Sequence, residues 1–174
     1  MRLFIEIPID DVRPFLPILG RLKTIPGIRI TDSSQIHITI AFIGDNDEPK
    51  RIIDSIRRSA SGFRTFDIDI GKMGFFGGNG RSSIIWIGAE PSDTLTELAD
   101  TIRKGLDADG IDYDDKPFKA HITLGRSKNG SIPSESMMKS YDRITTIRCN
   151  RVLVMSSEQT GRGYVHKVLS EIRF

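Results

Sequence analysis

Two of the three histidines in this chain of 174 residues open the same four-residue pattern, once in each half of the sequence. The pattern stands as His37-Ile38-Thr39-Ile40 and again as His121-Ile122-Thr123-Leu124. Both stretches alternate polar and apolar residues, which predicts half-buried strands, and residues i and i+2 of a strand point to one face. Each motif therefore presents an imidazole beside a hydroxyl. Two such pairs facing one cleft would supply a base, an acid and two hydroxyl donors, a set suited to attack on a phosphodiester.

We predict that His37 and His121 are the catalytic pair. The unperturbed pKa of imidazole, about 6.5, lets both protonation states coexist near neutrality. One neutral histidine can take a proton from a nucleophile while a charged one gives a proton to a leaving oxygen, so no metal or other cofactor is required. Thr39 and Thr123 are predicted to bind substrate by donating hydrogen bonds to non-bridging phosphate oxygens, although threonine is also common in strands for structural reasons.

The residue five places after the second histidine is Arg126, just past Gly125. Arginine suits phosphate because its guanidinium donates in bidentate geometry. In an unbroken strand, however, Arg126 would point away from His121. Its role in binding phosphate therefore requires a bulge or a turn at Gly125, and a solvated charge at the strand end is the alternative.

Each of the remaining candidate residues could have a structural role in place of a functional one. Phe42 follows His37 by five places and is predicted to stack on a nucleobase, as is Tyr164, with core packing as the alternative for each. The glycine-rich segment 75–81 lacks the spacing of a phosphate-binding loop, which favours a hairpin or a surface loop. His166 has no threonine partner and is interpreted as structural or exposed, and Cys149 as a small packing residue.

The predicted elements fall into two similar halves, each carrying one histidine motif. Strands are expected at Leu3–Ile7, His37–Ile43, Phe66–Ile70, Ile84–Ile87, Ala120–Leu124, about Thr146–Met155 and about Tyr164–Phe174, with a glycine-rich loop over Gly74–Gly80. Helices are expected from a cap at Asp10 to about Leu22, over about Pro49–Ala60, and from about Ser92 to near Gly110. The motifs lie about half the chain length apart, which favours one domain, residues 1–174, of two pseudo-symmetric halves.

Composition indicates an ordinary soluble domain. The chain is 38% hydrophobic and 28% charged, and its net charge of +2 permits a polyanionic substrate without demanding one. Cys149 is the only cysteine, so an internal disulfide is excluded and a reducing compartment is favoured. No signal peptide or membrane span is evident. We expect a cytoplasmic monomer that does not bind membranes.

The motif pair resembles the 2H phosphoesterase superfamily, and most closely its RNA 2′,3′-cyclic phosphodiesterase branch, historically called 2′-5′ RNA ligases. That branch's first motif, His-x-Thr-Leu-x-Phe-Leu-Gly, is similar to residues 37–44, with Ile for Leu at two places. Its second motif, His-x-Thr-Leu-x-Arg, is similar to residues 121–126. The opening strand and the late segment 156–169 are also similar to the branch, and Ala120 stands where the branch usually has proline.

The resemblance implies a bilobal, duplicated α+β fold, with two antiparallel sheets lining a central cleft and helices on the outer faces. It also implies metal-free hydrolysis of RNA 2′,3′-cyclic phosphate ends to 2′-phosphate, with a weak reverse capacity to form 2′-5′ linkages. RNA or nucleotides with such ends would be the partners.

Three other functions stay open on the sequence. The histidines would hold a metal if acids such as Asp45 or Asp115 joined them. The chain would be a non-catalytic RNA- or nucleotide-binding module if the histidines only contacted phosphate. Within the superfamily, the substrate would be another cyclic nucleotide or a 2′-5′ oligonucleotide.

Overall fold

The computed structural model describes residues 1–90 and 92–174 and has the expected α+β architecture. Its strands are β1 (Arg2–Pro8), β2 (Arg29–Ile30), β3 (His37–Asp45), β4 (Phe66–Gly77), β5 (Ser83–Ala89), β6 (His121–Ser127), β7 (Thr145–Cys149), β8 (Arg151–Thr160) and β9 (Gly163–Arg173). Its α-helices are α1 (Leu16–Lys23), α2 (Pro49–Ala60), α3 (Asp93–Ala108) and α4 (Glu135–Lys139), with short 3-10 helices at Arg13–Phe15 and Ser33–Gln35.

The strands form one antiparallel path in the order β7-β4-β5-β6-β3-β1-β8-β9, with β2 paired to β6. Two four-strand portions, β7-β4-β5-β6 and β3-β1-β8-β9, meet where β3 lies beside β6. Only one residue pair, Ile38 opposite Ile122, is in register at that junction. The two antiparallel sheets expected from the sequence are therefore two portions of one sheet, joined at a single pair.

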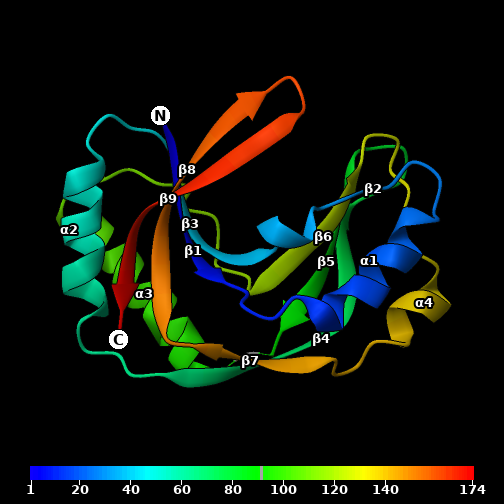
Figure 1. Ribbon diagram of the computed structural model, residues 1–174, viewed down its shortest axis with the longest axis horizontal. Helices are drawn as coiled ribbons and strands as arrows, with labels where there is room; N and C mark the ends of the chain where they lie inside the picture. Colours follow the sequence, from blue (N-terminus) through cyan, green and yellow to red (C-terminus); the bar gives the residue numbers. More distant parts are fainter. Residues whose placement is uncertain (91) are drawn as a thin grey trace.

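Helices cover the outer side of each portion of the sheet, and some of them connect strands of the other portion (Figure 1). Helices α2 and α3 pack on each other and contact β9 and β3, whereas α1 contacts β2 and β6, and α4 contacts β4. In the chain, however, α3 connects β5 to β6, and α1 lies between β1 and β3. Each portion of the sheet is thus covered partly by a helix whose flanking strands belong to the other portion.

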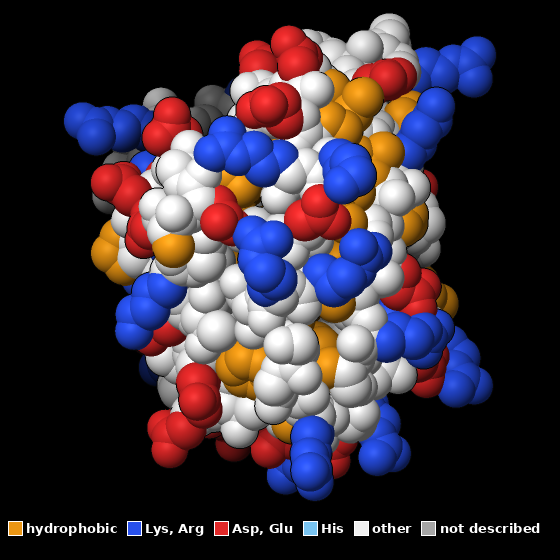
Figure 2. All heavy atoms as spheres, turned by 90° about the vertical axis from the view of Figure 1, so that its left-hand side faces the viewer, with side chains coloured by type: hydrophobic (Ala, Val, Ile, Leu, Met, Phe, Trp, Pro, Cys, Tyr) orange, Lys and Arg blue, Asp and Glu red, His pale blue; other side chains and the backbone are white. Residues whose placement is uncertain are grey.

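Helices α2 and α3 begin and end close to where the sequence predicts. Helix α2 buries Ile52, Ile56 and Ala60 and leaves its charged residues outside. Helix α3 follows Ser92, whose Oγ accepts a hydrogen bond from the Leu95 backbone N–H at 3.0 Å, as expected of a cap. Figure 2 shows the face that carries these helices, where basic and acidic side chains are interspersed.

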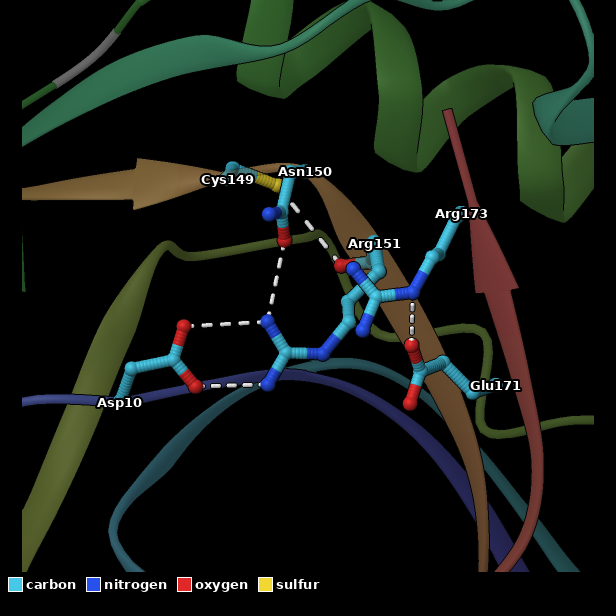
Figure 3. A network of polar contacts seen from close by, with 6 residues as sticks. All are labelled: Asp10, Cys149, Asn150, Arg151, Glu171 and Arg173. Carbon is cyan, nitrogen blue, oxygen red and sulfur yellow. Dashed lines mark hydrogen bonds and ion pairs between the residues drawn. The ribbon is translucent and has the colours of Figure 1, made fainter.

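The prediction that Asp10 caps the first helix is wrong. Helix α1 starts only at Leu16, because a proline has no N–H for the helical ladder and Pro17 is tolerated only in the first turn. Asp10 instead accepts hydrogen bonds from Arg151, at 2.6 Å from Nη2 and 3.0 Å from Nη1 (Figure 3). Asn150 Oδ1 accepts a further bond from the same guanidinium. This network ties the segment after β1 to the start of β8.

Two further expectations about strands need correction. The glycine-rich loop over 74–80 is shorter than predicted, because β4 continues to Gly77 while pairing with β5. The single strand expected over Thr146–Met155 is two strands that break at Asn150, since β7 pairs with β4 and β8 pairs with β1. Helix α4 was not anticipated. Ser134 caps it, accepting a hydrogen bond from the Met137 N–H.

Candidate active site

The two motif strands have the same pattern of burial along seven residues. From His37 and from His121, the order is half-buried, buried, half-buried, two buried residues in succession, exposed and buried. The two consecutive buried residues mark a bulge, because β3 shifts register against β1 between Thr39 and Ala41, and β6 shifts against β5 between Thr123 and Gly125. The bulge returns the fifth residue after each histidine to the histidine's face. The bulge or turn that the role of Arg126 requires at Gly125 is thus confirmed.

Each bulge is supported from outside its strand pair. The carbonyl of Ile40, the extra residue in β3, accepts a hydrogen bond from Arg103 Nε of α3 at 3.1 Å. The carbonyl of Leu124, the extra residue in β6, accepts one from the Thr31 backbone N–H at 2.8 Å. A buried carbonyl without a partner would be costly, so these contacts stabilise the irregular geometry.

The junction of the two sheet portions brings the motifs side by side. Ile38 and Ile122 lie opposite each other and are fully buried, so their neighbours point to the other face of the sheet. Because the pairing is antiparallel, His37 lies on the side of Thr123, and His121 lies on the side of Thr39. Directly opposite residues in such a pair have Cβ atoms about 4.5–5.5 Å apart. Two imidazoles and two hydroxyls therefore share one small area.

Both imidazole rings are oriented by the same local contact. Nδ1 of His37 lies 2.6 Å from the Gln35 carbonyl oxygen, and Nδ1 of His121 lies 2.6 Å from that of Lys119. A carbonyl oxygen only accepts, so Nδ1 carries the proton of the neutral ring and Nε2 is left for acid–base chemistry. Nε2 of His37 lies 3.0 Å from Thr39 Oγ1.

Burial lowers the pKa of both histidines. The pKa of His37 falls to about 4, chiefly through desolvation, with positive charge at His166, His121 and Arg126 acting in the same direction. The pKa of His121 is lowered by burial and by the charges of Arg126 and Lys119. Neutral imidazoles are ready to act as bases, whereas an acid role requires negative charge nearby. Because the charge of Arg126, in the second motif, lowers the pKa of His37, in the first, the two motifs influence each other electrostatically.

Aromatic side chains form the apolar surroundings of the rings. The Phe4 ring centroid lies 5.3 Å from that of His37, and the Phe76 and Trp86 centroids lie 5.3 Å and 6.2 Å from that of His121. Phe76 belongs to the β4–β5 hairpin that spans the glycine-rich segment, so the hairpin interpretation of that segment is confirmed. The apolar contacts account for the desolvation of both imidazoles.

The residues predicted to bind substrate are accessible. Phe42 is 54% exposed and Tyr164 is 45% exposed, so core packing, the alternative for both, is wrong. Arg126 is also exposed, on the face of His121. Tyr164 is held at the β8–β9 turn by Gln35, whose Nε2 donates to the Tyr164 carbonyl at 2.9 Å. Their contacts with substrate stay predictions.

Two residues near His37 were missed by sequence reasoning. The His166 ring centroid lies 6.0 Å from that of His37 and 4.9 Å from that of Phe4, so the residue is beside the site. Glu6 is only 6% exposed, and its Oε2 lies 3.4 Å from Nδ1 of His37. A lone acid within the apolar strand Leu3–Ile7 was the available signal for Glu6, whereas nothing in the sequence marks His166.

The structure also places Cys149 and the acids considered as metal ligands. Cys149 is buried, and burial raises the pKa of its thiol to about 12, which fits a packing residue. Among residues 1–90 and 92–174, no group of three or more His, Cys, Asp or Glu side chains is arranged to hold a metal ion, so neither Asp45 nor Asp115 completes such a site. None of the helices in this described part of the chain is long and apolar enough to cross a membrane.

Known proteins resemble this chain over most of its length. Residues 21–159 match the family model of the 2′-5′ RNA ligase superfamily. An RNA 2′,3′-cyclic phosphodiesterase of Archaeoglobus fulgidus is 33% identical over 81% of this chain and 81% of its own. One of Thermotoga maritima is 29% identical over 100% of this chain and 96% of its own.

Solved structures share the fold. The crystal structure of the Thermus thermophilus protein TT0787 superposes with a TM-score of 0.84 at 24% identity, covering 99% of this chain and 97% of that one. E. coli LigT complexed with 3′-AMP has a TM-score of 0.73 at 20% identity, with coverage of 99% and 97%. The doubled His-x-Thr motif, its shared geometry and the match over residues 21–159 agree: the chain belongs to the 2′-5′ RNA ligase superfamily.

Proposed function

We propose that this protein hydrolyses RNA 2′,3′-cyclic phosphate ends to 2′-phosphates by metal-independent acid–base catalysis. The observation that carries the proposal is the pairing of Ile38 with Ile122, which sets two similarly oriented imidazoles on one face of the sheet. Both rings have Nδ1 bound to a backbone carbonyl, which leaves Nε2 for the chemistry. A base and an acid on either side of one phosphorus atom are what an in-line displacement by water requires.

In the proposed reaction, water attacks phosphorus and the P–O3′ bond breaks. His121 takes the proton of the attacking water at Nε2, and His37 gives its Nε2 proton to the departing O3′. Thr39 and Thr123 donate hydrogen bonds to the non-bridging oxygens, whose charge grows in the transition state. Arg126 binds those oxygens on the His121 side, which leaves the exposed ring of Phe42 for the nucleoside.

The relatives support the substrate class. The Archaeoglobus and Thermotoga proteins bear the name RNA 2′,3′-cyclic phosphodiesterase, and the E. coli LigT structure is described as a complex with a nucleotide, 3′-AMP. We further propose that one copy of the chain acts alone as one domain of two related halves, since both histidines come from the same chain. We also propose that it acts in the cytoplasm, in keeping with its single, buried thiol.

A substrate panel tests the proposal directly. Cyclic 2′,3′-mononucleotides, RNA with a cyclic end, 3′,5′-cyclic nucleotides and 2′-5′ dinucleotides would be assayed in excess EDTA. We expect hydrolysis of the 2′,3′-cyclic compounds only, with a 2′-phosphate product identified by phosphorus NMR. A 3′-phosphate product would contradict the assignment of His37 as the acid. Activity on the 3′,5′-cyclic or 2′-5′ compounds alone would reassign the substrate within the superfamily. The reverse joining of ends, a weak activity that the family resemblance implies, would be measured with RNA bearing a cyclic end and a 5′-hydroxyl.

A further inference from the structure

Glu6 places a buried carboxylate against one of the two catalytic histidines. It lies in the middle of β1, paired with Thr39 of β3 on one side and Leu153 of β8 on the other. Phe4, Leu153 and Met155 form a small apolar cluster beside it. Glutamate is rarely buried unless it has a partner, and the group within reach of Glu6 is Nδ1 of His37, 3.4 Å from Oε2.

We call each motif strand, with its histidine and threonine, an arm of the site. The arm of His121 carries no carboxylate at the position equivalent to Glu6. Thr39 is paired with Glu6, whereas Thr123 is paired with Trp86 of β5. The two arms share the histidine, the threonine, the carbonyl that binds Nδ1 and the bulge. They differ in having a carboxylate beside one imidazole and an indole beside the other.

We propose that Glu6 is a positioning residue that favours the protonated form of His37, which makes His37 the proton donor and leaves His121 as the base. This inference deepens the proposed function and rests on it for the identity of the reaction. The contact between Glu6 and His37 is a property of the protein alone, so it can be tested without any substrate.

The electrostatics around His37 show why a countercharge is needed. Burial lowers the pKa of His37 to about 4, and positive charge on His166 of β9 and on His121 and Arg126 of β6 opposes its protonation further. Glu6, on β1, is the acid in contact with the ring. Burial also raises the pKa of Glu6 to about 7, so each group resists ionisation when the other is neutral.

The two charges therefore favour each other. An anionic carboxylate near Nδ1 attracts the imidazolium that forms when Nε2 takes up a proton, and apolar surroundings strengthen that attraction. The Nδ1–H donates to the Gln35 carbonyl at 2.6 Å, which keeps the ring in place while Glu6 contributes charge. A bound phosphate anion on the Nε2 side would favour the charged ring further.

The decisive variant is Glu6→Gln, which keeps the shape of the side chain and removes its charge. The matched control is Glu97→Gln, which removes the same charge from an exposed position of α3. The pKa of each histidine would be followed by nitrogen NMR of the imidazoles, with and without adenosine 2′-monophosphate. We expect Glu6→Gln to lower the titration midpoint of His37 by about one pH unit or more, and Glu97→Gln to leave it unchanged.

Kinetics provide the second readout. If His37 is the acid, the alkaline limb of the pH–rate profile reports its deprotonation. Loss of Glu6 must move that limb to lower pH, and kcat at pH 7.5 should fall about tenfold for each pH unit that the limb moves. Glu6→Asp, which keeps the charge on a shorter side chain, should restore the limb in part.

The outcomes separate the two proposals. A folded Glu6→Gln protein with the wild-type His37 titration and alkaline limb would overturn the role of Glu6. If Glu6→Gln does not fold, a titration of the Glu6 carboxyl that is identical in the wild type and in His37→Ala, followed by carbon NMR, would overturn it as well, because the coupling between the two groups is reciprocal. If the wild type does not hydrolyse 2′,3′-cyclic phosphates, the proposed function fails, but the NMR titration still decides whether Glu6 controls the charge of His37.

Discussion

At the scale of single residues, the site depends on how each imidazole is held. A backbone carbonyl two residues earlier binds Nδ1 in both arms, so the ring orientation follows from the local chain. What surrounds the rings is not local. Phe4 and Glu6 reach His37 from β1, His166 reaches it from β9, and Phe76 reaches His121 from β4.

Removing either of the two histidines that we propose to be catalytic should abolish most of the activity. Each of His37→Ala and His121→Ala is expected to lower kcat by about 10²- to 10⁴-fold, the usual contribution of a general acid or base. The double variant should lose less than the product of the two single losses, because both groups act in one step. Steady-state kinetics would measure this, with circular dichroism to verify folding. Wild-type turnover in either folded variant would show that the two-histidine mechanism is wrong.

The threonines should matter less than the histidines. Thr39→Val and Thr123→Val keep the shape of the side chain and delete one hydroxyl donor. Removal of a single well-placed oxyanion donor costs about 10²- to 10³-fold, and a neutral hydroxyl that shares the phosphate with other donors should fall at or below that range. The same kinetic assay would show it. If both valine variants retain wild-type kinetics, the hydroxyls have only a structural role.

The buried carboxyl of Glu6 should make stability depend on pH. Its pKa is raised from 4.5 to about 7, so the folded state holds this proton more tightly than the unfolded chain does. That contribution to the free energy of unfolding is fully present below pH 4.5 and is lost as the pH rises through 7. Relative to the wild type, Glu6→Gln, which cannot ionise, should therefore gain up to about 3 kcal/mol as the pH rises from about 4.5 to about 8, and less to the extent that ionised Glu6 is paired with protonated His37. Urea unfolding at both pH values would measure this, and an equal difference at the two would contradict it.

Much of the residue-scale picture could be predicted from the sequence, and the rest could not for a physical reason. Alternation along residues 37–40 and 121–124 is a local pattern, and it places each histidine and its threonine on one face. The positions of Glu6 and His166 depend on which strands become neighbours, and no local pattern encodes that. Arg126 is an intermediate case. Its spacing from His121 shows that a bulge is required for it to reach the site, but does not show that a bulge is present.

At the scale of elements, the two bulges decide which side chains reach the site. Without the extra residue, Phe42 and Arg126 would point to the face opposite their histidines. Helix α3 supports one bulge through Arg103, which also donates to the Lys116 carbonyl at 2.7 Å and packs against Tyr113. A helix outside the site therefore controls its geometry.

Replacing Arg103 should weaken both the fold and the nucleoside side of the site. Arg103→Met leaves the Ile40 carbonyl without its side-chain donor, which should cost about 1–3 kcal/mol of stability in urea unfolding. KM should rise more than kcat falls, since Phe42 is displaced while the histidines keep their carbonyl contacts. Arg57→Met, which removes an exposed arginine paired with Asp54, is the control and should change stability by less than about 0.5 kcal/mol. A similar effect of both variants would argue against a special role for Arg103.

At the scale of the whole molecule, the exchange of helices makes the two portions of the sheet depend on each other. Helix α3 covers β3 although it connects β5 to β6, and α1 contacts β6 although it lies between β1 and β3. Neither portion of the sheet is therefore covered only by the helices that connect its own strands. The sequence predicts two similar halves, but not this exchange, because the periodicity of a helix defines its apolar face and not the strand that the face covers. Consequently, we expect the halves to fold together.

Unfolding should be a single cooperative transition. Trp86 is the only tryptophan and reports on the β4–β6 portion, whereas the far-ultraviolet circular dichroism comes largely from the long helices α2 and α3 on the other portion. The two signals should have the same midpoint in urea, as in a two-state protein. Separate midpoints would show that the portions are independent folding units.

The single pair at the junction has a consequence for the rate of amide hydrogen exchange. Ile38 and Ile122 have fully buried side chains, yet the ladder between β3 and β6 consists of this one pair. Local opening there requires fewer broken hydrogen bonds than opening between β8 and β9, so exchange at the junction should be faster than its burial suggests. A phosphate ligand that contacts both arms binds only the closed junction and must slow that exchange in proportion to its occupancy. The exchange rates of individual amides at the junction would thus show whether a ligand contacts both histidines at once.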